Sequence, residues 1–150
     1  MDMENMVNKE EIILDWVRES PLMTDIVLLN WLNDRDGTGA IIPISETVAA
    51  DYFDGSKLIN YDFMLQFVCS MSDTTDTTNT DKMFDMRKWQ DWIEQQDENG
   101  NMPDFGGGYD MQEVKNLAGM PDLAQTYENG TGKYQFPARL VYLREIREKL

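Results

Sequence analysis

The 150-residue sequence contains no histidine and a single cysteine, Cys69. Without histidine, Ser-His-Asp and Cys-His catalytic arrangements are excluded, and so are zinc sites that use histidine ligands. One cysteine cannot form a disulfide within the chain, which suits a protein kept in a reducing compartment. Cys69 stands among apolar residues in a strand-like segment, so we expect a buried structural thiol rather than a nucleophile.

Basic residues are also scarce, with 13 Lys and Arg against 28 Asp and Glu and a net charge of −15. Proteins that bind DNA or RNA cluster basic side chains, and here the only such concentration, in residues 139–149, is interleaved with acids. A net charge this large favours solubility and repels polyanions. It indicates a solvated acidic surface, a surface that faces a polyanion, or an acidic mimic of nucleic acid.

No apolar run approaches the roughly 20 residues that a membrane-spanning helix needs, and the acidic, helix-like N-terminal segment does not resemble a signal peptide. We therefore expect no membrane association. Hydrophobic residues make up 41% of the chain and aromatic residues 11%, which is typical of a folded domain. The length fits one domain and no linker interrupts it, so we expect a single domain over residues 1–150.

Strict alternation of side chains marks two long strands. From Tyr61 to Met71, after the turn Asp54-Gly55-Ser56, apolar residues occupy every second position, which is typical of a strand with one face on a core. The segment Tyr134–Tyr142 shows the same alternation, and we expect it to form a hairpin with Leu123–Tyr127. Pro137 inside this last strand favours an edge position or a bulge.

Two helices are predicted. The first runs from about Asn8 to Glu19, with Asn8 as N-cap and Glu11 placed as in a capping box. The second runs from about Asp81 to Gln96, with its apolar residues on one side. The threonine-rich segment 72–80 before it is predicted to be a polar loop.

Shorter apolar segments complete the expected sheet. We predict strands at Ala40–Ile44, with its Pro43 at an edge or a strand end, at Met111–Leu117, and over Glu46–Phe53. The run Ile26–Leu32 fits a strand or a short helix equally well. The expected fold is α+β, a largely antiparallel sheet of five or six strands with two main helices packed on it.

No motif points to catalysis, a cofactor or a metal. The run Asp34-Arg35-Asp36-Gly37 faintly resembles a calcium loop, but aligning Gly37 with the loop glycine places Leu32 and Pro43 at ligand positions. Gly106-Gly107-Gly108 lacks the Lys-Ser/Thr that follows in a phosphate-binding loop. Acidic pairs are expected by chance in so acidic a chain. We therefore expect no enzyme, with no catalytic, cofactor or metal site.

Three stretches follow one another in a recognisable order. They are Tyr52–Met64, Trp89–Gln96 with the loop Asn101–Phe105 after it, and Gly132–Tyr142. In this order they resemble the tail terminator proteins (tail completion or minor tail proteins, at the head-tail joint) of long-tailed phages and prophages of Gram-positive bacteria. The chain departs from the family pattern at Pro137 and in the long threonine-rich segment before the second helix.

The resemblance implies a small α+β protein that assembles as a homo-oligomeric ring, commonly a hexamer. Such a ring caps the finished tail tube, terminates tail polymerisation and provides the joint to the head completion proteins. The implied partners are further copies of the chain, the tail tube protein and a head completion protein, while DNA passes through the lumen without specific binding. The implied location is the host cytoplasm during assembly and then the virion tail.

A ring requires a head-to-tail contact between unlike surfaces of neighbouring subunits. We expect Phe105 and Tyr109, which look exposed in the glycine-rich segment 102–110, to lie in this subunit interface. The alternative function rests on charge alone: an acidic, nucleic-acid-mimicking protein that blocks a DNA-binding partner. Ring particles would favour the first function, and a monomer that captures a basic protein would favour the second.

Overall fold

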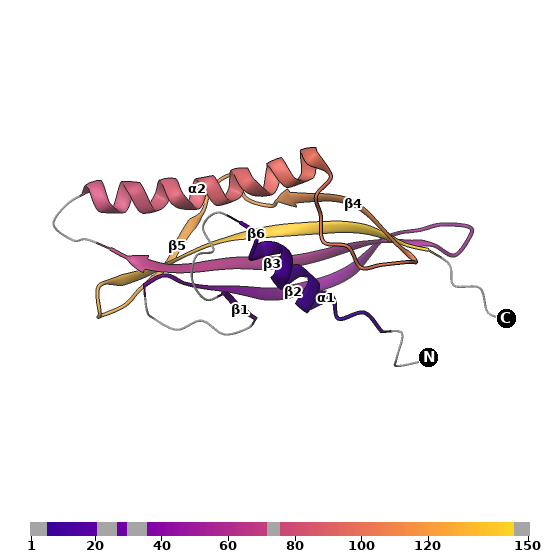
Figure 1. The fold of residues 1–150 in the computed structure, drawn as a ribbon, viewed down its shortest axis with the longest axis horizontal. Helices are drawn as coiled ribbons and strands as arrows, with labels where there is room; N and C mark the ends of the chain where they lie inside the picture. The colour runs from indigo at the N-terminus through magenta and orange to yellow at the C-terminus, as the bar shows by residue number, and fades with distance from the viewer. Residues whose placement is uncertain (1–5, 21–26, 30–35, 72–75, 146–150) are drawn as a thin grey trace.

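The computed structural model describes residues 6–20, 27–29, 36–71 and 76–145. These residues form two helices and six strands: α1 (Lys9–Val17), β1 (Val27–Leu29), β2 (Thr38–Asp51), β3 (Lys57–Ser70), α2 (Asp76–Asn99), β4 (Tyr109–Asn116), β5 (Asp122–Thr126) and β6 (Thr131–Arg144). The strands form one sheet in the order β1-β2-β3-β6-β4, and β5 pairs with the first part of β6 (Figure 1). Only β1 and β2 are parallel among these pairs. The predicted α+β fold, a largely antiparallel sheet with two helices, is therefore confirmed.

The core lies between the two helices and one face of the sheet. Trp89 of α2 packs edge-on against Phe136 at 5.3 Å between ring centroids, and Trp16 of α1 meets Trp92 of α2 at 4.8 Å. Alternate residues of the two central strands supply the sheet side of the core: Ile59, Tyr61, Phe63, Leu65, Tyr134, Phe136, Ala138, Leu140 and Tyr142. The alternation read from the sequence thus identifies the buried face correctly.

The opposite face of the sheet carries polar pairs across the β3–β6 ladder. Arg139 donates two hydrogen bonds to the Asp62 carboxylate, at 2.7 and 3.0 Å, and this pairing raises the pKa of the guanidinium. Gln66 donates to Gln135 at 2.9 Å. Cross-strand pairs of this kind contribute modestly to stability but favour a single register.

The prediction that Pro137 marks an edge or a bulge is wrong, because β6 lies inside the sheet and pairs with β3 without a register shift. On the side of β6 away from β3, Pro137 lies between the residues that pair with β5 and those that pair with β4. Its carbonyl accepts from the Leu117 N–H at 3.0 Å. The N and C=O of one strand residue point to the same side. The N–H that proline lacks would therefore point away from β3, so no β3–β6 ladder bond is lost.

Most helix and strand predictions are confirmed, with shifted ends. Asn8 caps α1 as expected, since its side chain accepts from the Glu11 N–H at 3.2 Å. Strand β3 begins at Lys57 rather than Tyr61. The loop predicted over 72–80 is wrong from residue 76 onward, because α2 already begins there; residues 72–75 lie outside the described part.

Strand β2 extends the two predicted segments Ala40–Ile44 and Glu46–Phe53 into one strand with two bulges. Pro43 lies beside the first bulge, beyond the stretch of β2 that pairs with β1, and among the described residues no strand pairs with it on that side. The run Ile26–Leu32 contains the short strand β1, and its other residues lie outside the described part. The predicted strand Met111–Leu117 corresponds to β4, and Leu123–Tyr127 to β5.

Phe136 and Phe84 offer a matched test of this core. Phe136 is fully buried, whereas Phe84 on α2 is 58% exposed. We expect Phe136→Ala to lower the free energy of unfolding by about 3–5 kcal/mol, since it leaves a cavity under Trp89. Phe84→Ala should change it by less than about 0.5 kcal/mol. Urea unfolding followed by tryptophan fluorescence measures both, and equal effects would contradict the assigned core.

Candidate interaction surface

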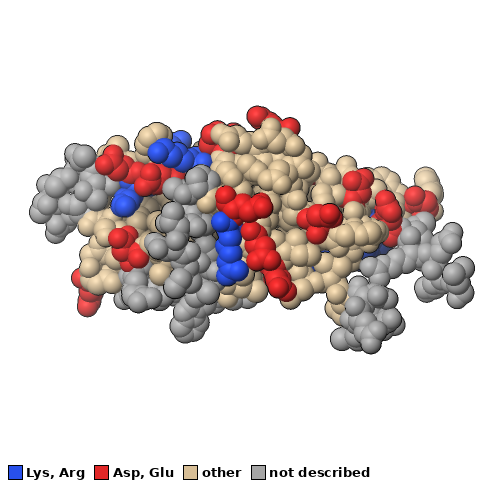
Figure 2. Space-filling model, in the orientation of Figure 1, with Lys and Arg blue, Asp and Glu red and all other residues tan. Residues whose placement is uncertain are grey.

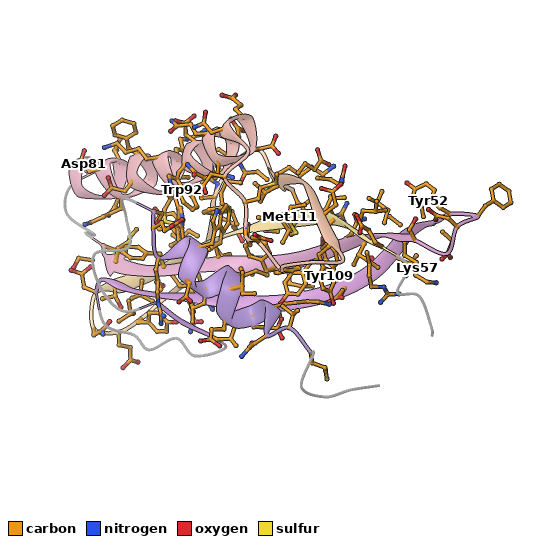
Figure 3. The ribbon with its side chains drawn as sticks, turned by 45° about the vertical axis from the view of Figure 1, so that its right-hand side comes forward. Tyr52, Lys57, Asp81, Trp92, Tyr109 and Met111 are labelled. Carbon is orange, nitrogen blue, oxygen red and sulfur yellow. The ribbon has the colours of Figure 1, made fainter. Side chains whose placement is uncertain are left out.

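The turn between β2 and β3 forms one end of the molecule and projects beyond β4 and β6 (Figure 1). Figure 3 shows Tyr52 and Lys57 at this end and Asp81, near the start of α2, at the other. We call residues 51–57 the hairpin tip. Since Lys57 pairs with Arg144, the last residue of β6, the tip lies just past the end of the central ladder.

The hairpin tip is held in one shape by its own hydrogen bonds. Gly55 N donates to Tyr52 O at 2.9 Å and Tyr52 N to Ser56 O at 3.0 Å. The Asp54 carboxylate accepts from both the Ser56 N–H, at 2.9 Å, and the Ser56 hydroxyl. The hydroxyl bond, followed by the backbone bond, lowers the pKa of Asp54, so this carboxylate is ionised at neutral pH. Gly55 has φ of 88°, a conformation that favours glycine.

This rigid turn exposes an aromatic side chain. Phe53 is 114% exposed, so no other described part of the subunit covers it. Tyr52, which precedes it in the tip, and Val48 and Ile44 on β2 are each about half exposed. Because β1 pairs only with residues 39–41, the backbone edge of β2 from residue 42 to 51 has no strand partner among the described residues. Natural proteins protect such edges with charges, prolines, bulges or a covering helix or loop, and β2 carries Pro43, Glu46 and two bulges along this stretch.

A pocket lies at the other end of the sheet from the hairpin tip, where β3 ends and β6 begins. This end pocket has a volume of about 500 Å³. It is lined by residues from four segments of the chain: Met71, Asn79, Leu123, Thr126, Tyr127, Glu128, Gly130 and Thr131. A smaller pocket of about 300 Å³ lies beside the hairpin tip, between Tyr52, Leu58 and Leu143. Both ends of the molecule therefore carry apolar surface.

The residues predicted for the subunit interface are not where the sequence suggested. Phe105 is buried, with 3% of its surface exposed, and Tyr109 is half-buried. Both pack against Tyr142, with ring centroids 5.2 and 5.7 Å away. The exposure expected for Phe105 and Tyr109 is therefore wrong, and their role in a subunit interface stays a prediction. Replacing Phe105 with Ala would disturb the core, so it is a poor test of that role.

A polar cluster joins α1 to the sheet close to these rings. The first β2 bulge, between Pro43 and Ser45, turns the Glu46 side chain to the helix-covered face. There the Glu46 carboxylate contacts the Lys9 ammonium at 2.7 Å and accepts from the Tyr142 hydroxyl at 2.7 Å. Nearby, the Tyr61 hydroxyl donates to Glu10 at 2.9 Å. The cluster thus connects the first helix with β2, β3 and β6.

The charges in this cluster set its protonation states. Partial burial raises the pKa of Glu46, but hydrogen bonds from Lys9 and Tyr142 outweigh it, and the net pKa is lowered. Burial and the neighbouring carboxylates raise the pKa of Tyr61 and of Tyr142. Both tyrosines therefore remain protonated donors over the ordinary pH range, and the cluster stabilises the fold rather than exchanging protons.

Cys69 is buried as expected, and burial raises the pKa of its thiol to about 11, so little thiolate forms at neutral pH. Within the described ranges, no three His, Cys, Asp or Glu side chains are grouped to hold a metal ion. No helix in those ranges is long and apolar enough to cross a membrane.

The Glu46 cluster yields a pH-dependent prediction. A carboxyl whose pKa is lowered by folding stabilises the protein above its ordinary value of 4.5 and loses this contribution as the pH falls through the folded value. We expect Glu46→Gln to lower the free energy of unfolding by about 0.5–1 kcal/mol at pH 7. This difference from wild type should shrink below about pH 4.5. Urea titrations at several pH values measure it, with the exposed Glu98→Gln as control; a difference independent of pH would contradict the ion pair.

Comparison with known proteins leaves these surfaces unassigned. No protein-family model matches the chain, and no curated protein matches it in sequence. We therefore infer the function from the hairpin tip, the two ends of the sheet and the charge.

Proposed function

We propose that this chain is a structural virion protein that caps the phage tail tube as a ring, terminates tail polymerisation and provides the joint to the head completion proteins. One observation carries the proposal: a projecting turn, fixed by its own hydrogen bonds, exposes Phe53 completely. Aromatic side chains are enriched at the centre of protein–protein interfaces relative to the rest of the protein surface. The order of segments resembling tail terminators supports the same function.

The shape of the subunit suits a ring. A ring forms when one surface of a subunit contacts a different surface of the next, and the rotation closes. The elongated sheet has unlike ends: the hairpin tip projects at one end (Figure 1), and the end pocket lies at the other. Further copies of the chain are therefore one class of partner, and the tail tube protein and a head completion protein are the others.

The acidic surface suits a channel that passes DNA. Figure 2 shows Asp and Glu side chains spread along the length of one face, with Lys and Arg between them. On α2 the exposed acids include Asp81, Asp91, Glu94 and Glu98. Acids in the ranges 73–85 or 97–104 that line the lumen would repel the duplex and keep it from adhering. Asp97 is less available for this, because its carboxylate accepts from the Val114 N–H at 3.0 Å.

The same charge opposes assembly of free subunits. Each copy carries −15, so repulsion between copies is strong at low ionic strength and is screened as salt rises. We therefore expect free subunits to remain apart at low salt. Salt, or a tail tube that holds several subunits together, would favour ring closure.

Microscopy and mass in solution test the proposed function. We expect the purified protein to be monomeric in about 20 mM salt and to form closed rings of constant subunit number in about 1 M salt, where the Debye length is about 3 Å. Negative-stain images show the rings, and light scattering gives their mass. A chain that is monomeric at every salt concentration and instead captures a basic DNA-binding protein would favour the nucleic-acid mimic.

A reconstruction of the ring also tests the role of the charge. We expect acidic side chains, those of α2 in particular, to line its channel. A closed ring with a neutral or basic channel would contradict electrostatic repulsion of DNA while leaving the capping function intact.

A further inference from the structure

The end pocket has an apolar floor, formed by Met71 and Leu123, within a lining that also includes the polar residues Asn79, Thr126, Glu128 and Thr131. Met71 and Leu123 meet over Gly132, where a Cβ would lie 2.7 Å from Met71 Cγ and 3.2 Å from Leu123 Cδ1. Leu123 is 43% exposed, and Tyr127 adds an aromatic side chain to the lining. A volume of about 500 Å³ lies within the range of sites that enclose small organic groups, and it is roomy for one phenyl ring. Methionine adapts its shape well to an aromatic partner.

The hairpin tip cannot reach the pocket of its own subunit. Strand β3 begins beside the tip at Lys57 and ends beside the pocket at Ser70, and the strand is unbroken between them. At about 3.3 Å per residue the two ends are roughly 40 Å apart. Any Phe53 that enters this pocket therefore belongs to another molecule.

We propose that Phe53 of one copy inserts into the end pocket of a second copy, between Met71, Leu123 and Tyr127. This contact rests on the proposed ring and identifies the two surfaces that join its subunits. A second copy fits both surfaces, because the same chain presents the exposed Phe53 side chain at one end and a pocket with Met71, Leu123 and Tyr127 in its lining at the other. The contact joins unlike surfaces, so its repetition builds a ring where the rotation between neighbours closes and an open chain where it does not.

The contact is weak by itself, which fits controlled assembly. Burial of one aromatic side chain offsets only part of the entropy lost when two proteins associate. Closing a ring makes the last contact intramolecular and raises the effective concentration of its surfaces. The exposed edge of β2 behind the tip adds further apolar contact through Val48 and Ile44.

Site-specific photo-crosslinking tests this contact directly. Phe53 is replaced by p-benzoylphenylalanine, which keeps an aromatic ring at the tip, and the protein is irradiated at about 1 M salt. We expect covalent dimers and larger species whose links, located by mass spectrometry, join position 53 to peptides containing Met71 or Leu123. The matched control carries the same probe at Phe84, which is exposed on α2, and should give no link to those peptides.

Blocking the pocket provides the second arm. Leu123→Glu in the probe-bearing chain places a charge in the apolar floor and should reduce the link at least tenfold. Met120→Glu, an equally exposed apolar position outside the pocket lining, should leave it unchanged. All of these positions are exposed, so thermal unfolding followed by circular dichroism should match that of the wild type and exclude misfolding as the cause.

The outcomes separate the contact from the ring. Links between two tips, links to another surface, or no links at all would overturn the proposed contact. If closed rings form but the links lie elsewhere, the capping function stands and the pocket assignment fails. If the links join tip and pocket but only open chains appear, the contact stands and the closed ring fails.

Discussion

The fold and its interaction surfaces depend on the long pairing of β3 with β6. Fourteen residues of each strand pair without a register shift, from Lys57 opposite Arg144 to Ser70 opposite Thr131. This register places the alternating apolar residues of both strands on one face, where the two helices cover them. It also makes the subunit long, because neither strand bends back. The hairpin tip and the end pocket are consequently held at opposite ends of one stiff element.

The sequence predicts this central pair well, because a half-buried strand shows its face through strict alternation. It predicts Pro137 poorly, since the position a proline tolerates depends on which neighbour its missing N–H would face. Here the relevant neighbours, β4 and β5, are separated from each other along the same side of β6. The early start of α2 is missed for a related reason: a polar first turn resembles a polar loop.

The interaction surfaces are predicted less completely than the fold. Composition marks the glycine-rich segment as a loop, but it does not show that Phe105 folds back onto Tyr142. The Asp54-Gly55-Ser56 turn is visible in the sequence, whereas the exposure of Phe53 requires knowing that the turn projects from the sheet. The end pocket combines four separate segments, so no local pattern could reveal it.

In the proposed ring, charge and apolar contact oppose each other, and the balance between them would decide when subunits assemble. The proposed Phe53 contact alone is too weak to hold together two copies that each carry a net charge of −15 at low salt. Several such contacts formed together, with the charges screened or the subunits held on a tube, exceed the repulsion. A stronger contact or a neutral surface would let rings close before a tube is complete. We therefore propose that a minimal contact on a highly charged subunit keeps free copies apart at low salt and favours ring formation on a tail tube.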